Sequence, residues 1–212
     1  MPIFSKVDFI GIVYLLFFEF KHFYDNKKFN YMKRFLGSFF EVVEVALIAL
    51  VTVFLVRTFL LQPFLVNGAS MEPNFKNGDY LLVDELTYRL REPKRGEVVV
   101  FKYPGDESTY YIKRIIGLPG ERVKLDGAEI TVYNDSNEEG LKINENYLND
   151  QVQYIAKDYT LKDDEFFVLG DNRSYSFDSR SWGPLIDKEL IGLVRVRLWP
   201  VTNASIFETP IY

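Results

Sequence analysis

Apolar residues are arranged in two different ways along the chain, and the change falls near residue 62. Residues 39–61 (FFEVVEVALIALVTVFLVRTFLL) form a nearly continuous apolar run without a polar face. As a helix this run would rise about 35 Å at ~1.5 Å per residue, enough to cross a hydrocarbon layer of ~30 Å. The pattern predicts a membrane span over residues 39–61 that ends before Pro63. A buried core helix is the alternative, and it would normally show a polar side.

The first 38 residues hold a shorter apolar patch and a basic segment. The patch, residues 9–18 (FIGIVYLLFF), is short for a span, so an interfacial helix and a first, tilted crossing both stay open. Lys21, Lys27, Lys28, Lys33 and Arg34 follow it, and the positive-inside rule places them in the cytoplasm. Everything after the span is then expected outside. No small-x-small cleavage site closely follows the apolar run, which favours a retained anchor over a removed signal peptide.

From Tyr80 onward the pattern changes to short runs rich in β-branched and aromatic residues, separated by Gly, Pro, Asn and Asp. These runs are YLLV, GEVVVFKY, TYYIKRIIG, ERVKL, ITVY, EFFVLG and LIGLVRVRLW. They predict a β-rich domain over residues 62–212. The acidic stretch 134–140 (NDSNEEG) is expected to be a solvated hairpin end without chemistry.

Composition removes several classes of mechanism. The chain has no cysteine and a single histidine, His22, which lies far from the β-rich region. A Ser-His-Asp triad, a Cys-His pair and a His- or Cys-based zinc site are therefore excluded there. No Asp or Glu cluster has recognisable metal-ligand spacing, so no metal and no cofactor are expected.

Charge argues against nucleic acid as a partner. The net charge is −5, and residues 65–212 alone sum to −7. Phosphate neutralisation needs clustered Lys and Arg, and this region has no basic stripe.

Lysine is the first candidate for a general base in a chain with this composition. The two-residue period of a strand puts Lys113 on one face with Tyr111 and Ile115. Among apolar neighbours the charged amine loses hydration, so its pKa falls from ~10.4 towards the range that a base requires. The alternative is a lysine that snorkels from a sheet edge beside Arg114.

Ser70 lies in NGASMEPNF, shortly after the apolar run. Gly68 and Ala69 leave room for a peptide backbone, and the Ser70 amide can act as an oxyanion donor. An extended chain rises at most ~3.3 Å per residue, which keeps Ser70 within about 30 Å of the end of the span. A serine beside Gly and Asn is otherwise an ordinary turn residue.

A third stretch, residues 170–184 (GDNRSYSFDSRSWGP), combines four serines with two Asp and two Arg. It is either a surface turn with a weak ion pair or a loop folded over a site.

Four motifs in order resemble the bacterial type I signal peptidases, membrane-anchored serine proteases with a Ser/Lys dyad. They are QPFLVNGASMEP, RGEVVVFKYP, YYIKRIIGLPGERV and GDNRSYSFDSR, and they cover much of residues 62–200. The resemblance implies a mostly β fold of antiparallel sheets forming a partial barrel, preceded by one or two N-terminal transmembrane helices. It also implies a small second β-subdomain at about residues 126–165.

The resemblance also implies roles for individual residues. Ser70 would be the nucleophile and Lys113 the general base, with Ser176 hydrogen-bonded to the lysine amine and an Asp178–Arg180 ion pair bracing the loop. Val66, Gly68, Met71 and Tyr111 would line shallow substrate pockets. The chain departs from the family pattern at Gly68, where many members have a Ser that completes the oxyanion hole, and at Asn74, where Thr is usual.

The implied substrates are secretory preproteins, cut after a small-x-small motif. The implied location is the bacterial cytoplasmic membrane, with the catalytic domain on the extracytoplasmic side and the lipid bilayer and the Sec translocon as neighbours. One alternative is an inactive membrane-anchored β-domain that binds exported chains without cutting them. Self-cleaving Ser/Lys repressors share the dyad but need a DNA-binding domain and no anchor.

Overall fold

The computed structural model describes residues 30–59, 61–148, 152–207 and 209–210. Its first element is helix α2 (Asn30–Phe59), which begins ahead of the apolar run and ends just short of Pro63. Within the described residues, no helix combines the length and the apolar character needed to cross a membrane. The span predicted over residues 39–61 is thus unconfirmed and stays a prediction. The apolar patch at residues 9–18 and His22 lie outside the described residues.

The strands all belong to the second of two compact units, which begins at Val53. The larger of two sheets has the strand order β1-β2-β11-β3-β4-β9-β10, with β12 paired to β11, and its pairings are antiparallel. Its strands are β1 (Leu61–Leu65), β2 (Tyr80–Asp84), β3 (Val98–Tyr103), β4 (Asp106–Gly117), β9 (Glu165–Leu169), β10 (Leu185–Ile186), β11 (Leu190–Trp199) and β12 (Ser205–Ile206). The mostly β, antiparallel fold expected from the sequence is confirmed.

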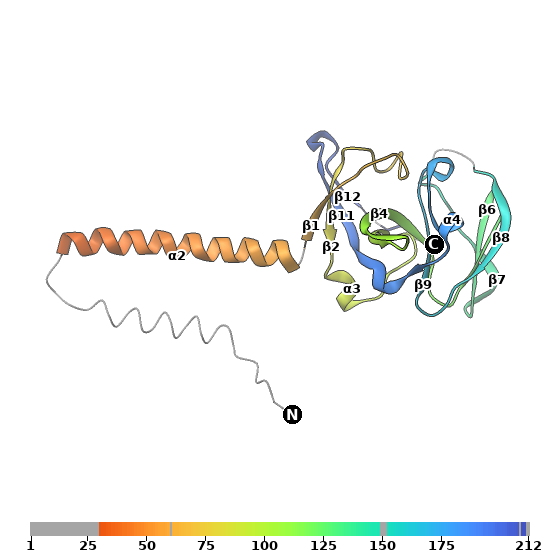
Figure 1. Cartoon of the computed structure of the whole chain (residues 1–212), viewed down its shortest axis with the longest axis horizontal. Coiled ribbons are helices and arrows are strands. Elements are labelled where there is room, and N and C mark those ends of the chain that lie inside the picture. Colours follow the sequence, from red (N-terminus) through yellow and green to blue (C-terminus); the bar gives the residue numbers. More distant parts are fainter. Residues whose placement is uncertain (1–29, 60, 149–151, 208, 211–212) are drawn as a thin grey trace, which may run out of the picture. The chain divides into compact units, whose positions relative to one another are not determined.

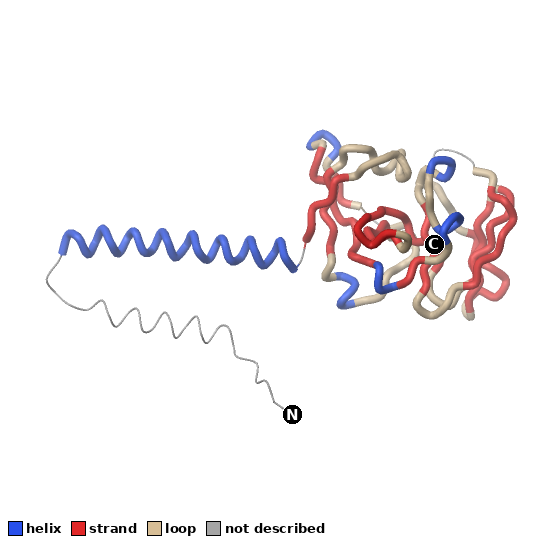
Figure 2. Tube along the Cα trace, in the orientation of Figure 1, coloured by secondary structure: helices blue, strands red, loops and turns tan. Residues whose placement is uncertain are grey.

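A smaller antiparallel sheet is inserted between β4 and β9. It has the order β7-β6-β5-β8, built from β5 (Arg122–Gly127), β6 (Glu129–Asn134), β7 (Asn137–Lys142) and β8 (Tyr154–Thr160). Figures 1 and 2 show the strands gathered in two groups, the small sheet lying beyond β9. It covers most of the region predicted as a second β-subdomain.

Short helical turns fill the connections: α3 (Thr87–Leu90), η1 (Arg173–Tyr175), α4 (Ser179–Trp182), η2 (Asp187–Glu189) and η3 (Val201–Asn203).

Three apolar clusters hold the sheets together. Strand β3 lies between two of them, which explains why its sequence is a continuous apolar run. Val98 and Val100 face one cluster while Val99 and Phe101 face another, so both faces of the strand are covered. A third cluster joins the inner face of the small sheet to Phe167 and Leu169 of β9. Full burial of one such side chain stabilises the fold by about 1.5–3 kcal/mol.

The apolar runs from Tyr80 onward each form a strand, and the run 190–199 has the bounds of β11. Two strands, β1 and β8, formed where the sequence pattern did not predict them. Pro63 does not merely end a helix: it lies within the edge strand β1, where a missing N–H is tolerated. The acidic stretch 134–140 is a hairpin end, as predicted: it spans the end of β6, a turn and the start of β7. Strand β8 was not predicted, because most of its side chains are exposed and show no alternation of apolar and polar residues.

Candidate active site

Ser70 lies in the connection between β1 and β2. Hydrogen bonds from Val66 N to Asp79 O and from Gly78 N to Val66 O, both 2.9 Å, close the base of this connection. Met71 and Phe75 are each 1% exposed and anchor the turn that follows Ser70 in the apolar core. At Gly68 the backbone has φ +100°, a conformation that side-chain-bearing residues rarely adopt. Ser70 therefore lies on a turn that backbone hydrogen bonds hold at its base and that buried side chains anchor after the serine.

Lys113 lies on β4, and its side chain reaches Ser70. Its Nζ donates to Ser70 Oγ at 2.7 Å and to the Ile112 carbonyl at 2.9 Å. Only 3% of the residue is exposed, so the snorkelling alternative is wrong. The amine also lies 5.3 Å from the centre of the Tyr111 ring, which shares its face of the strand.

Burial sets the ionisation of this lysine. Loss of hydration lowers the pKa of Lys113 to about 8, and the negative charges of Asp178 and Asp171 act in the opposite direction without cancelling the effect. An amine with this pKa is partly neutral near pH 7.5 and is able to accept a proton.

The stretch after β9 folds against the serine turn. Asn172 N donates to the Ser70 carbonyl at 3.0 Å, and Asn172 Nδ2 donates to the Ala69 carbonyl at 3.1 Å. A Cβ on Gly170 would overlap the Ser70 carbonyl oxygen and Ser176 Oγ. The close approach of the two loops thus requires glycine at position 170, and the stretch is no simple surface turn.

The hydrogen bond predicted between Ser176 and the lysine amine is absent from this structure. Ser176 Oγ is buried and has no hydrogen-bond partner among the described residues. Its side chain lies against Gly170, while Lys113 Nζ donates to Ser70 Oγ and the Ile112 carbonyl.

Asp178 and Arg180 form the ion pair that was expected. Arg180 Nε and Nη2 each lie 2.8 Å from a carboxylate oxygen of Asp178, whose side chain is fully buried. Asp178 also accepts from Gly170 N at 3.1 Å, and Arg180 Nη2 donates to the Arg173 carbonyl at 2.6 Å. The pair therefore ties the two ends of the loop together.

An open groove of about 330 Å³ runs beside Ser70 and Lys113. Val66, Gly68 and Tyr111 line it as predicted, whereas Met71 lies in the core beneath the turn and does not. Two further walls, Tyr175 and Phe177, were missed. Their signal in the sequence is a pair of aromatic residues within an otherwise polar loop.

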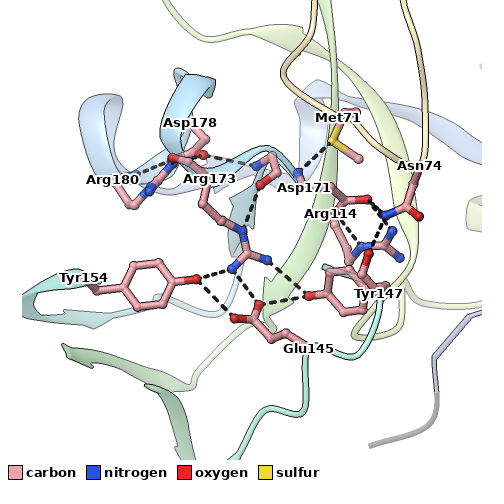
Figure 3. Close-up of polar contacts among 11 residues, drawn as sticks. Met71, Asn74, Arg114, Glu145, Tyr147, Tyr154, Asp171, Arg173, Asp178 and Arg180 are labelled. Carbon is pink, nitrogen blue, oxygen red and sulfur yellow. Dashed lines mark hydrogen bonds and ion pairs between the residues drawn. The ribbon is translucent and has the colours of Figure 1, made fainter. Parts of the chain in front are cut away.

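A buried polar network that the sequence did not reveal lies close to Ser70 and Lys113 (Figure 3). Arg114, next to Lys113 on β4, makes two hydrogen bonds of 2.8 and 2.6 Å to the Asp171 carboxylate. Asn74 Nδ2 donates to Asp171 at 2.8 Å and to the Tyr147 carbonyl at 3.0 Å. These contacts link residues far apart in the sequence, which no local pattern marks.

No cluster of three or more potential metal-ligating side chains occurs in the part of the chain that the structure describes.

Comparisons with known proteins agree on one family. The model for "Signal peptidase, peptidase S26" matches residues 39–199. A signal peptidase I P of Bacillus subtilis subsp. natto is 36% identical over 179 residues, 82% of this chain and 96% of that protein. A probable signal peptidase I-2 of Synechocystis is 34% identical over 176 residues, 80% and 78% of the two chains.

Among solved structures, a signal peptidase I from Enterococcus faecalis aligns with a TM-score of 0.42 at 26% identity, covering 49% of this chain and 97% of that one. The family match and the identity to these relatives show that the chain is a serine endopeptidase and belongs to the signal peptidase family, peptidase S26.

Proposed function

We propose that this chain removes signal peptides from secretory preproteins, with Ser70 as nucleophile and Lys113 as general base. The observation that carries the proposal is the 2.7 Å separation of Lys113 Nζ and Ser70 Oγ, at an amine that is 3% exposed. A buried amine with a pKa near 8 replaces the histidine that this part of the chain lacks.

The chemistry follows from this geometry. Neutral Lys113 takes the hydroxyl proton while Ser70 Oγ bonds to the scissile carbonyl carbon, and the C–N bond then breaks as the lysine returns the proton to the leaving amine. Water hydrolyses the acyl-enzyme with the same lysine as base. The Ser70 amide is proposed as one oxyanion donor. The Gly68 amide already donates to Asn77 Oδ1 at 2.9 Å, so we propose that another group is the second oxyanion donor.

Ser176 and the Asp178–Arg180 pair are proposed as supporting residues. A lysine ammonium has three N–H donors, and two of those of Lys113 already have acceptors. The buried, unpartnered Ser176 hydroxyl is proposed to accept the third after a small rotation, when the lysine carries the proton. Asp178 and Arg180 keep the loop that bears Ser176 in place.

The substrate is proposed to lie extended in the groove beside Ser70. Val66, Gly68 and Tyr111 leave shallow space, which suits small residues before the scissile bond. Relatives that match most of the chain carry the name signal peptidase I, which supports this substrate class. No cofactor is required by this chemistry.

Anchoring in the bacterial cytoplasmic membrane, with residues 62–212 on the extracytoplasmic side near the lipid surface and the Sec translocon, is also a proposal. It is supported by the apolar sequence of residues 39–61 and by the basic residues ahead of it. Alkaline carbonate extraction of bacterial membranes checks it: the chain is expected in the pellet, and release into the supernatant would refute the anchor.

The function is tested with the purified full chain in detergent and a preprotein that carries a small-x-small site. Wild type is expected to release the signal peptide, while Ser70→Ala and Lys113→Ala lose at least about 10³-fold in kcat. Ser174→Ala, an exposed serine in the same loop, serves as the control. Wild-type turnover by either dyad variant would show that the assignment is wrong.

A further inference from the structure

The segment that follows β7 reaches the active site from the small sheet. Ile143 keeps the segment anchored, since its side chain is buried and its N–H donates to the Ile130 carbonyl at 2.9 Å. Glu145 and Tyr147 come next and point towards the loop after β9 (Figure 3). Neither residue lies in any of the four motifs that mark the family.

Glu145 holds an arginine of that loop. Its carboxylate lies 2.6 Å from Arg173 Nη1, and the Arg173 side chain has no exposed surface. The hydroxyls of Tyr147 and Tyr154 also donate to Glu145, at 3.0 and 3.1 Å. Burial acts to lower the pKa of Arg173, but the combined effect of Glu145, Tyr147 and Tyr154 raises this pKa above its ordinary value, so the guanidinium stays charged.

Arg173 connects Glu145 to the turn that carries Ser70, through Gly170. Its Nε donates to the Gly170 carbonyl at 2.8 Å, and Gly170 is the residue that touches the Ser70 carbonyl. The position of Ser70 therefore depends on a carbonyl whose partner is held by Glu145.

Tyr147 contacts the other two parts of the site. Its carbonyl accepts from Asn74, which lies on the serine turn, and its ring lies 4.1 Å from the guanidinium carbon of Arg114, the neighbour of Lys113. One segment thus meets the serine turn, the lysine strand and the loop after β9.

We propose that Glu145 and Tyr147 are positioning residues for the Ser70–Lys113 pair, acting through Arg173, Asn74 and Arg114. The inference rests on the proposed function and deepens it. The segment that carries Glu145 and Tyr147, the strut, keeps the nucleophile and the base at a fixed relative position. Misplacement of reacting groups by about 1 Å costs on the order of 10²-fold in rate, so loss of the strut is expected to appear in kcat.

The test uses the purified full chain in detergent and compares Glu145→Gln with the double variant Glu145→Gln/Arg173→Met. Removing one partner of a buried ion pair destabilises a protein, whereas replacing both with uncharged side chains is often neutral. Glu145→Gln is expected to lower both Tm and kcat, the latter about 10–100-fold. The double variant is expected to regain the Tm and keep the low kcat, because methionine at position 173 cannot donate to the Gly170 carbonyl.

KM is expected to stay within about twofold in both variants, since Glu145 and Arg173 do not line the groove that is proposed to bind the substrate. Glu139→Gln, an exposed glutamate on β7, is the matched control. Recovery of kcat together with Tm in the double variant, or wild-type kcat in Glu145→Gln, would overturn the proposal. Should Glu145→Gln not fold, Tyr147→Phe decides it, because it removes only the hydroxyl that contacts Glu145 and Arg173: kcat about tenfold lower at an unchanged KM supports the strut, and wild-type kcat refutes it.

A second readout separates this inference from the proposed function. The rate at which a small serine-acylating agent modifies Ser70 depends on the dyad and not on a signal peptide. If wild type is acylated normally but does not cut the preprotein, only the substrate assignment is refuted. The acylation rate of Glu145→Gln relative to Glu139→Gln would then still decide the role of the strut, a decrease supporting it and equality refuting it.

Discussion

Lys113 Nζ and Ser70 Oγ lie 2.7 Å apart, although 43 positions separate the two residues in the sequence. The lysine is fixed by strand β4 and the serine by a turn with Met71 and Phe75 in the core. This pairing places an amine of lowered pKa against a single hydroxyl.

The first prediction concerns the pH dependence of cleavage. Only neutral Lys113 can accept the serine proton, and the pKa of Lys113 is about 8. The kcat/KM of the free enzyme is therefore expected to rise about tenfold per pH unit below 8 and to level off above it. Initial rates between pH 6 and 9 check this, and a flat profile would count against a lysine base.

The same burial predicts an effect on stability. The folded-state pKa of Lys113, about 8, lies below the unfolded value of 10.5, so the folded state binds fewer protons between these values and stability rises with pH. At about 1.4 kcal/mol per pKa unit, burial of the lysine costs roughly 3 kcal/mol at pH 7.

Lys113→Met is thus expected to be inactive and more stable than wild type at pH 7, with the difference shrinking towards pH 10. Urea unfolding at several pH values measures the difference. A variant that is less stable than wild type at pH 7, or a difference that does not change with pH, would contradict this account of the lysine.

Gly170 is predicted to be irreplaceable. An added Cβ would overlap the Ser70 carbonyl oxygen and Ser176 Oγ, so Gly170→Ala must push the two loops apart. The expected result is a kcat about 10²-fold lower, with a stability loss of about 1–3 kcal/mol. Ser174→Ala in the same loop is the control, and a Gly170→Ala enzyme with wild-type kcat would show that the contact does not position Ser70.

Ser176→Ala is expected to separate stability from activity. The Ser176 hydroxyl is buried without a partner, and removing an unsatisfied buried group is neutral or stabilising. If this hydroxyl accepts from the lysine ammonium during turnover, kcat falls by about 10–100-fold while Tm stays or rises. Thermal melting and steady-state kinetics on the same sample measure both, and an unchanged kcat would remove Ser176 from the mechanism.

The sequence predicts the fold best where strands are buried on at least one face. Strand β11 has the predicted bounds, and its middle residues Leu193 and Val194 are buried in the core. Strand β8 shows no such pattern, since only its first residue is buried. Strand β1 was hidden at the end of the apolar run, where its composition continues that of the helix.

The sequence suggested candidate site residues only where a motif is contiguous. Ser70, Lys113 and the Asp178–Arg180 pair lie within motifs, and the structure brings them to one place. The strut was missed because Glu145 forms an ion pair with Arg173, a residue distant in the sequence, and no local pattern predicts such a contact. Met71 was placed in a pocket wall because adjacency in the sequence does not show which side of a turn faces the core.

Lys113 is buried beside Ser70 with a lowered pKa, and NMR titration of ¹³Cε-labelled lysine in the detergent-solubilised chain measures this pKa directly. The signal of Lys113 is identified by its absence in Lys113→Met. A midpoint of about 8 is expected for this signal. A midpoint at the ordinary lysine value near 10.4 would contradict it.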